Sequence, residues 1–168
     1  MEPTTRAGGG DGDREAVSIS YRPIGVVRSP HAQLAGMPLQ TVSARDVAGV
    51  VEVADEFAGG LEDVEGFSHL ILVTHLHATT GWTPRVVPFL DDRPRGVFAC
   101  RSPRRPNPIG LSLVRLVRVE GRRLHVLDVD LLDGTPVLDI KPYVPRFDAC
   151  ETARVGWFAG PSPGDDSR

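Results

Sequence analysis

The chain is poor in several residue types that would mark particular classes of protein. Its 168 residues include 18 arginines but one lysine (Lys141), one asparagine (Asn107) and two cysteines. Cys100 and Cys150 lie far apart and form no C-x-x-C pattern, which favours reduced thiols and a cytoplasmic location. No apolar run is long enough to span a membrane, and no signal-peptide core follows the N-terminus.

Motifs of common nucleotide-binding and hydrolytic enzymes are also missing. There is no G-x-G-x-x-G after an expected strand, no G-x-x-x-x-G-K-[ST] and no G-x-S-x-G, so dinucleotide, P-loop and nucleophile-elbow sites have no support. His75 and His77 fall on one face of an expected strand. Two imidazoles without a third ligand are weak evidence for zinc, and we expect no metal site.

A stiff, basic segment stands out against this background. Residues 101–110 read Arg-Ser-Pro-Arg-Arg-Pro-Asn-Pro-Ile-Gly. Each proline fixes its own φ and pushes the preceding residue towards an extended conformation. The net charge of the chain is −3, yet five arginines and no acid lie between positions 93 and 105. Such a patch suits an anion such as phosphate, although a solvated loop is the alternative.

The rest of the chain predicts a mainly β protein. We expect disordered tails at 1–17 and 159–168, one domain over 18–158, and a helical turn within 59–66. Short apolar runs separated by Gly and Pro, with little helical periodicity, favour a small antiparallel barrel or sandwich. The expected strands are 19–28, 47–57, 69–77, 96–101, 111–119, 124–131 and 137–140, the fifth and sixth forming a hairpin.

Several polar residues are candidates for a binding site. Arg101 could hold a carboxylate or phosphate bidentately, or cap loop carbonyls. Alternation along 124–131 places Asp128 and Asp130 on one face, where they could accept hydrogen bonds from a ligand. Asp133 could do the same or could form a simple turn. Lys141 and Asp139 share a strand face, so this lysine either contacts an anion or pairs with the aspartate.

Four motifs in order resemble the TsaA-like family, the tRNA methyltransferase O group. They are Ile-Gly-Val-Val-Arg-Ser-Pro at 24–30, Gly-Phe-Ser-His-Leu at 66–70, the region 96–112 around the proline-rich segment, and 133–143. The resemblance covers about residues 20–145. It implies a small β-barrel methyltransferase that binds S-adenosylmethionine without a Rossmann sheet, usually as a homodimer.

The resemblance also implies a set of cofactor contacts and an acceptor. The acceptor would be N6-threonylcarbamoyladenosine next to the tRNA anticodon. The residues matching the family's cofactor contacts are Pro38, Leu39, Gln40, Thr41, Val42, Ser43, His77, Ala78, Arg101, Leu111, Leu127, Asp128, Val129 and Asp130. Candidates for contact with RNA or substrate are Arg93, Arg95, Arg104, Arg105, Asn107, Lys141 and Tyr143. His77 and Asp133 are the candidates for a general base.

Two alternatives remain open from the sequence. The same barrel could methylate a small metabolite, because Leu39 stands where relatives often carry arginine and we expect no appended domain. The arginine cluster alone would also suit an RNA-binding barrel without catalysis.

Overall fold

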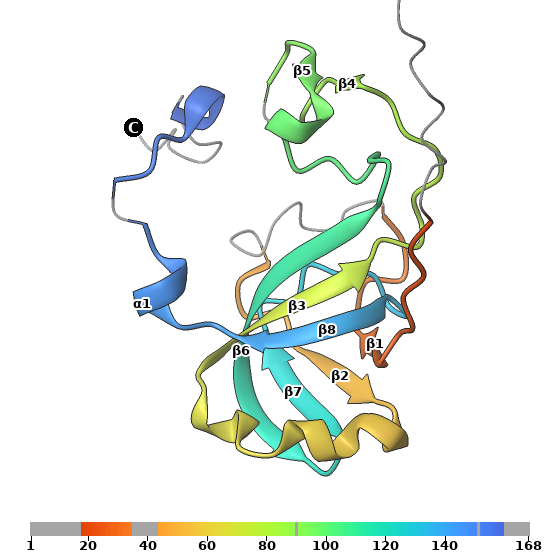
Figure 1. Cartoon of the computed structure of the whole chain (residues 1–168), viewed down its shortest axis with the longest axis vertical. Helices are drawn as coiled ribbons and strands as arrows, with labels where there is room; N and C mark the ends of the chain where they lie inside the picture. Colours follow the sequence, from red (N-terminus) through yellow and green to blue (C-terminus); the bar gives the residue numbers. More distant parts are fainter. Residues whose placement is uncertain (1–17, 35–43, 90, 151, 160–168) are drawn as a thin grey trace, which may run out of the picture.

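Six strands of this chain form a closed antiparallel barrel. A computed structural model describes residues 18–34, 44–89, 91–150 and 152–159. The barrel strands are β1 (Gly25–Arg28), β2 (Gly49–Val53), β3 (His69–His75), β6 (Ile109–Glu120), β7 (Arg123–Leu127) and β8 (Pro136–Pro142). Their order around the barrel is β1-β2-β7-β6-β3-β8, and β8 pairs with β1 to close it (Figure 1). The predicted mainly β barrel fold is therefore confirmed.

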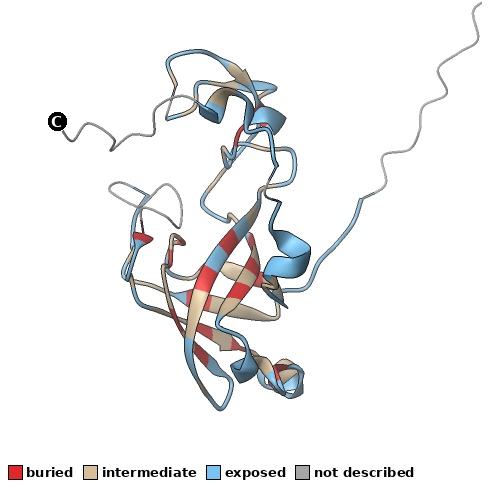
Figure 2. Ribbon diagram, turned by 90° about the vertical axis from the view of Figure 1, so that its left-hand side faces the viewer, coloured by how far each residue is buried: buried red, intermediate tan, exposed pale blue. Residues whose placement is uncertain are grey.

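Alternating apolar residues explain why these segments become strands. In β3, Leu70, Leu72 and Thr74 are fully buried, whereas the residues between them are partly exposed. Successive side chains of a strand point to opposite faces, so one set fills the barrel and the other covers its outside. Figure 2 shows the same alternation of buried and intermediate positions along the strands. The core is almost entirely valine and leucine.

The two ends of the barrel are built differently. One end is covered by two 3-10 helices, η2 (Asp55–Leu61) and η3 (Val64–Gly66), and Leu61 packs into the core (Figure 1). The other end carries an arm, by which we mean residues 81–108. The arm contains β4 (Arg85–Val86), β5 (Arg95–Gly96) and the 3-10 helix η4 (Val97–Ala99). After β8 follow α1 (Pro145–Asp148) and η5 (Gly156–Ala159).

The hairpin predicted around residues 120–123 is confirmed. β6 and β7 pair up to Glu120 and Arg123, so the connection is two residues long. Gly121 occupies the first of these with a φ of 58°. Two-residue hairpin turns need positive φ there, and glycine adopts it without steric cost.

Several predicted strand boundaries are wrong. The expected strand 47–57 is shorter, because β2 ends at Val53 and η2 begins at Asp55. Of residues 96–101 only Gly96 belongs to a strand, β5, because the chain then turns tightly through η4 with Val97 and Cys100 buried at its two ends. Residues 18–24 lie outside β1, and Pro23 lacks the N–H that a ladder needs. β7 ends at Leu127 instead of 131. The expected tails at 1–17 and 159–168 lie outside the described residues, except for Ala159, which ends η5.

Candidate functional site

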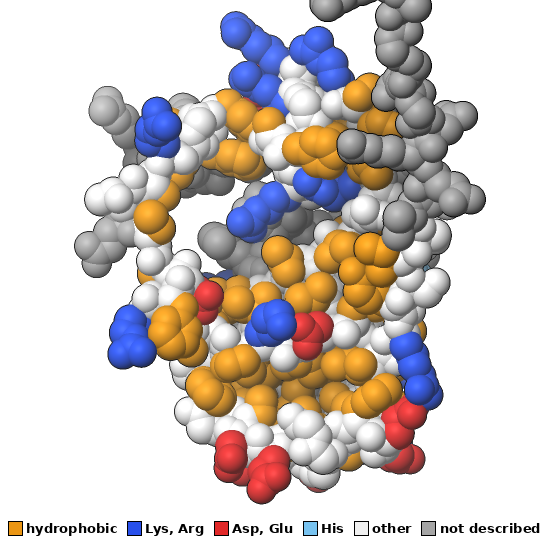
Figure 3. Space-filling view, viewed as in Figure 1, with side chains coloured by type: hydrophobic (Ala, Val, Ile, Leu, Met, Phe, Trp, Pro, Cys, Tyr) orange, Lys and Arg blue, Asp and Glu red, His pale blue; other side chains and the backbone are white. Residues whose placement is uncertain are grey.

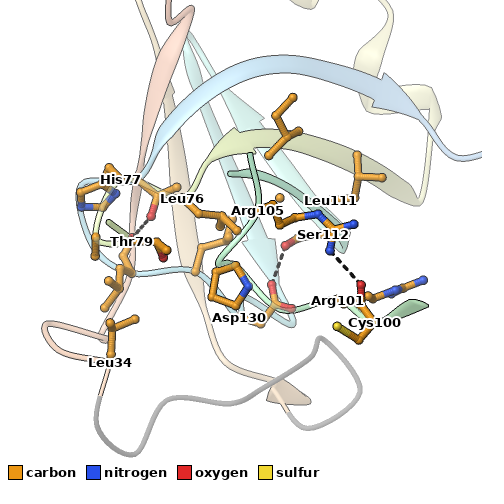
Figure 4. A pocket seen from close by; sticks show the side chains of 17 residues that line it. Leu34, Leu76, His77, Thr79, Cys100, Arg101, Arg105, Leu111, Ser112 and Asp130 are labelled. Carbon is orange, nitrogen blue, oxygen red and sulfur yellow. Dashed lines mark hydrogen bonds between the residues drawn. The ribbon is translucent and has the colours of Figure 1, made fainter. Parts of the chain in front are cut away.

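A cavity of about 500 Å³ opens at the arm end of the barrel. It lies where β3 ends, β6 begins, the chain leaves β7 and the proline-rich segment crosses over (Figure 4). Its volume falls in the range of small-molecule sites. The larger apolar side chains in its wall are Leu34, Leu76, Ile109, Leu111, Leu131 and Leu132.

Charged groups of both signs line this cavity. Asp130 accepts a hydrogen bond of 2.6 Å from Ser112 Oγ, and both residues line the wall. Arg101 and Arg105 line it from the proline-rich segment. In Figure 4 the Arg101 side chain extends away from Asp130.

The proline-rich wall is held together by Arg105. Its Nη1 donates to the carbonyl of Cys100 at 2.8 Å and to that of Ser102 at 3.3 Å. These bonds close residues 100–105 into a compact loop, in addition to the stiffness that prolines supply. A wall fixed in this way loses little entropy when a ligand binds.

An ion-pair cluster fixes the opposite wall. Asp128 has a φ of 69°, which ends β7 and redirects the chain. Its carboxylate accepts from Arg115 Nε at 2.5 Å and from the backbone N–H of Asp46 at 2.8 Å. Arg115 also bonds to the Asp46 carboxylate. The next residue, Val129, is fully buried, and Asp130 then enters the cavity wall.

The same cluster shifts two pKa values. The Arg115 guanidinium, by hydrogen bonding to Asp128, holds the pKa of that carboxyl below its usual value. In return the hydrogen bonds that Arg115 donates to Asp128 and Asp46 raise the pKa of Arg115. Both shifts favour the charged forms, so the cluster remains an ion pair at neutral pH.

The structure places five of the predicted cofactor contacts around this cavity: His77, Ala78, Arg101, Leu111 and Asp130. Three others lie elsewhere. Asp128 bonds to Arg115, Val129 is in the core, and Leu127 lines a shallow groove between β2, β6 and β7. The predicted contacts Pro38, Leu39, Gln40, Thr41, Val42 and Ser43 lie outside the described residues.

The prediction that Asp128 and Asp130 share a strand face is wrong. It assumed an extended strand through residue 131, and the positive φ at Asp128 breaks that alternation. Sequence reasoning also missed Ser112, which faces inward on β6 beside buried Val114. Ser112 could have been identified from the sequence as a polar residue at an inward position of an apolar strand.

The predicted RNA contacts fall into two groups. Arg93, Arg95, Arg104, Arg105 and Asn107 belong to the arm. Lys141 and Tyr143 lie at the end of β8, where Lys141 pairs with Asp139 at 2.6 Å, the alternative considered above. Arg95 pairs with Asp91 at 2.6 Å, whereas the Arg104 side chain makes no ion pair with any described residue.

Asp133, one of the two candidates for a general base, lies in a turn as considered above, but its carboxylate bonds to a distant segment and not to its own turn. Its Oδ1 accepts from the Ser29 backbone N–H at 3.2 Å, and it is absent from the cavity wall. His77, the other candidate, lines the cavity and is exposed. Within the described ranges no three His, Cys, Asp or Glu side chains group as a metal site would require. No helix in the described part of the chain has the length and apolarity to cross a membrane.

Comparison with known proteins defines the family. Residues 26–149 match the model of the tRNA-methyltransferase O N-terminal domain, and the chain belongs to this family. A "probable S-adenosyl-L-methionine-binding protein" of Pyrococcus abyssi is 52% identical over 140 residues, which cover 83% of this chain and 76% of that protein. The tRNA (adenine(37)-N6)-methyltransferase of Escherichia coli is 41% identical over 150 residues, covering 83% and 64%.

A solved structure agrees with the barrel described above. The crystal structure of TrmO from Pseudomonas aeruginosa superposes with a TM-score of 0.75 at 41% identity, covering 89% of this chain and 67% of that one. The chain thus spans about two thirds of the bacterial proteins it resembles.

Proposed function

We propose that this protein binds S-adenosylmethionine in the cavity at the arm end of the barrel and transfers its methyl group. The observation that carries the proposal is the presence of Arg101 and Asp130 on one cavity of about 500 Å³ whose wall also includes several leucines. The Pyrococcus abyssi relative, which is named as a probable binder of this cofactor, supports the same conclusion.

The chemistry of the wall fits the cofactor. S-adenosylmethionine combines a carboxylate and an ammonium with a sulfonium, ribose hydroxyls and a flat adenine. Arg101 suits the carboxylate, since a guanidinium can bind it through two parallel hydrogen bonds. Asp130 suits the amino or ribose groups, and Leu111 suits the adenine face.

When bound, the cofactor supplies an electrophilic methyl carbon whose bonding electron pair stays on sulfur as the methyl leaves. The chain must then position the attacking nitrogen in line and exclude water. The attacking nitrogen loses one proton, which His77 could accept because it lines the cavity and remains reachable. The fixed walls hold the reacting groups in place; neither wall needs to form a covalent bond.

We propose tRNA carrying N6-threonylcarbamoyladenosine as the acceptor. The Escherichia coli relative acts on adenine 37 of tRNA, as its name states, and the arm places arginines next to the cavity. A small-molecule acceptor is the second candidate. The relatives from Pyrococcus abyssi and Archaeoglobus fulgidus are named only for cofactor binding.

We also propose a homodimer, on the basis of the outer face of β3 and β6. Ile71 pairs with Leu113, and these two side chains and that of Val73 point out of the barrel. Figure 3 shows this largely apolar surface, interrupted by one basic and one acidic side chain. A continuous apolar patch is typical of a protein interface. Light scattering gives the test, since a monomer has a mass of 18.2 kDa.

Two measurements test the proposed function. Titration calorimetry with S-adenosylmethionine should show saturable binding in the micromolar-to-millimolar range. Mass spectrometry of tRNA nucleosides from a deletion strain should show loss of methylated threonylcarbamoyladenosine. Absence of any binding heat would refute the methyltransferase proposal, whereas cofactor binding with unchanged tRNA nucleosides would favour the small-molecule acceptor.

A further inference from the structure

One exposed aromatic ring stands beside the cavity without contributing to its wall. Phe98 lies in η4 and its exposed fraction is 77%. Its neighbours on the turn, Val97 and Cys100, are both buried. The Cys100 thiol donates to the Val97 carbonyl at 3.4 Å, and Val97 N–H donates to Pro84 O at 3.0 Å. The ring is therefore presented to solvent by an anchored turn.

The ring is also linked to the cavity through an arginine. The Arg105 guanidinium carbon lies 5.7 Å from the centre of the Phe98 ring, and Arg105 lines the cavity. Phe98 and Arg105 together form a flat apolar and cationic ledge at the cavity rim. An exposed apolar ring of this size does not gain the free energy that burial would provide. Such rigid exposure is expected where the ring contacts a partner.

The surroundings of the ledge are cationic. The arm carries six arginines and, among its described residues, two acids, Asp91 and Asp92. Figure 3 shows basic side chains interspersed with apolar ones at the arm end of the molecule. Aromatic rings next to unpaired positive charge are typical of single-stranded nucleic-acid sites, where bases stack on rings and arginines contact phosphates.

We propose that the ledge of Phe98 and Arg105 stacks an unpaired base of the RNA that flanks the nucleotide entering the cavity. The inference rests on the proposed function, because it takes the acceptor to be a base in a tRNA loop. A nucleotide placed in the cavity has neighbours within reach of the rim, and stacking them would hold the loop open during methyl transfer.

The test compares Phe98→Ala with a matched control. Phe147 on α1 is 70% exposed and has the Arg146 guanidinium 5.2 Å from its ring, but it is not part of the cavity or the arm. Binding of a fluorescent anticodon stem-loop carrying threonylcarbamoyladenosine would be followed by anisotropy. We expect Phe98→Ala to weaken binding about 5- to 150-fold. Phe147→Ala should bind like the wild type.

Three further readings separate stacking from other roles. Phe98→Tyr should restore affinity, whereas Phe98→Leu should not, because leucine keeps apolar area but no ring. The slope of log affinity against log salt should stay unchanged in Phe98→Ala, since no charge is lost. S-adenosylmethionine affinity by calorimetry should also stay within about twofold, as the ring is outside the cavity wall.

Several results would overturn the proposal. Wild-type RNA affinity in Phe98→Ala would do so, as would full rescue by leucine. A change from dimer to monomer in Phe98→Ala by light scattering would instead make the ring a subunit contact. Failure of the proposed function looks different, because the wild type itself would then fail to bind the cofactor, the RNA or both.

Discussion

Gly110 provides the sharpest test of how the cavity is built. It is the second residue of β6, pairs with Thr74 and lines the cavity, as Leu76 does. A Cβ added at this position would lie 2.6 Å from Thr74 Oγ1 and 2.8 Å from Leu76 Cδ2. Thr74 is fully buried and β-branched, so it has little rotamer freedom to move away. Leu76 has room to shift chiefly into the cavity.

Gly110→Ala should therefore weaken both folding and ligand binding. Overpacking of this kind costs about 1–3 kcal/mol. For a domain of this size each kcal/mol lowers the melting temperature by about 2–4 °C, so we expect a decrease of roughly 2–12 °C. Gly59→Ala is the control, because an added Cβ there meets no atom within 4 Å. Calorimetric melting and S-adenosylmethionine titration would be measured on both variants.

A double variant checks that the contact with Thr74 is the cause. Thr74→Ala should offset part of the loss in Gly110→Ala, giving a coupling energy of opposite sign to the single effects. If Gly110→Ala melts and binds like the wild type, the close approach does not constrain the cavity and the reasoning is wrong.

Three other predictions follow from the site and the core. Arg101→Ala should reduce S-adenosylmethionine affinity about 10- to 150-fold. Arg104→Ala should leave this affinity unchanged and lower the salt dependence of RNA binding. Equal cofactor affinity in Arg101→Ala and wild type would show that Arg101 does not contact the cofactor. Because the folded-state pKa of Asp128 is lowered from 3.8, its stabilisation is present above that pH and is lost as the pH falls below it. Urea unfolding between pH 5 and 3 should thus show a smaller loss of stability in Asp128→Asn than in the wild type, and parallel pH curves would contradict this. Leu72→Ala should cost about 2–5 kcal/mol of unfolding free energy, since Leu72 is fully buried, and Ile71→Ala on the outer face should cost less; equal losses would mean that the assignment of inner and outer faces is wrong.

The barrel could be predicted because its strands follow simple local rules. β3 has leucine at two of its three inward positions, Leu70 and Leu72, with Thr74 at the third, and the turn at Gly121 lies between the two strands β6 and β7. Both signals depend on a few neighbouring residues and on the two-residue period of a strand. Pairing order and closure required the structure, because alternation alone does not specify partners.

The boundaries that failed depend on contacts distant in sequence. Residues 96–101 have the composition of a strand, yet η4 forms there because Val97 and Cys100 are both buried. β7 ends before Asp128, whose backbone adopts a left-handed conformation. Arg115 and the backbone N–H of Asp46 stabilise it by hydrogen bonding to the Asp128 carboxylate. Such a conformation costs energy for a residue other than glycine, and tertiary contacts have to compensate for it.

The candidate site was predictable in part for the same reason. Arg101 belongs to a segment whose prolines mark it without reference to any partner. Asp130 was found together with Asp128, but only Asp130 reaches the cavity. The hydrogen bond from Ser112 to Asp130 joins β6 to the chain after β7. No local sequence pattern predicts a contact of that kind.

The two walls of the cavity depend on separate supports. The proline-rich wall relies on the bonds from Arg105 to Cys100 and Ser102, and the other wall relies on the ion pair between Arg115 and Asp128. Neither Arg115 nor Asp128 lines the cavity, yet Asp128 sets the backbone turn that delivers Asp130 two residues later. A ligand that contacts Arg101 on one wall and Asp130 on the other would depend on both sets of supporting bonds. The binding strength expected of this site therefore depends on arm and barrel together, because the arm contributes the positive charges of Arg101 and Arg105 and the chain after β7 contributes the negative charge of Asp130.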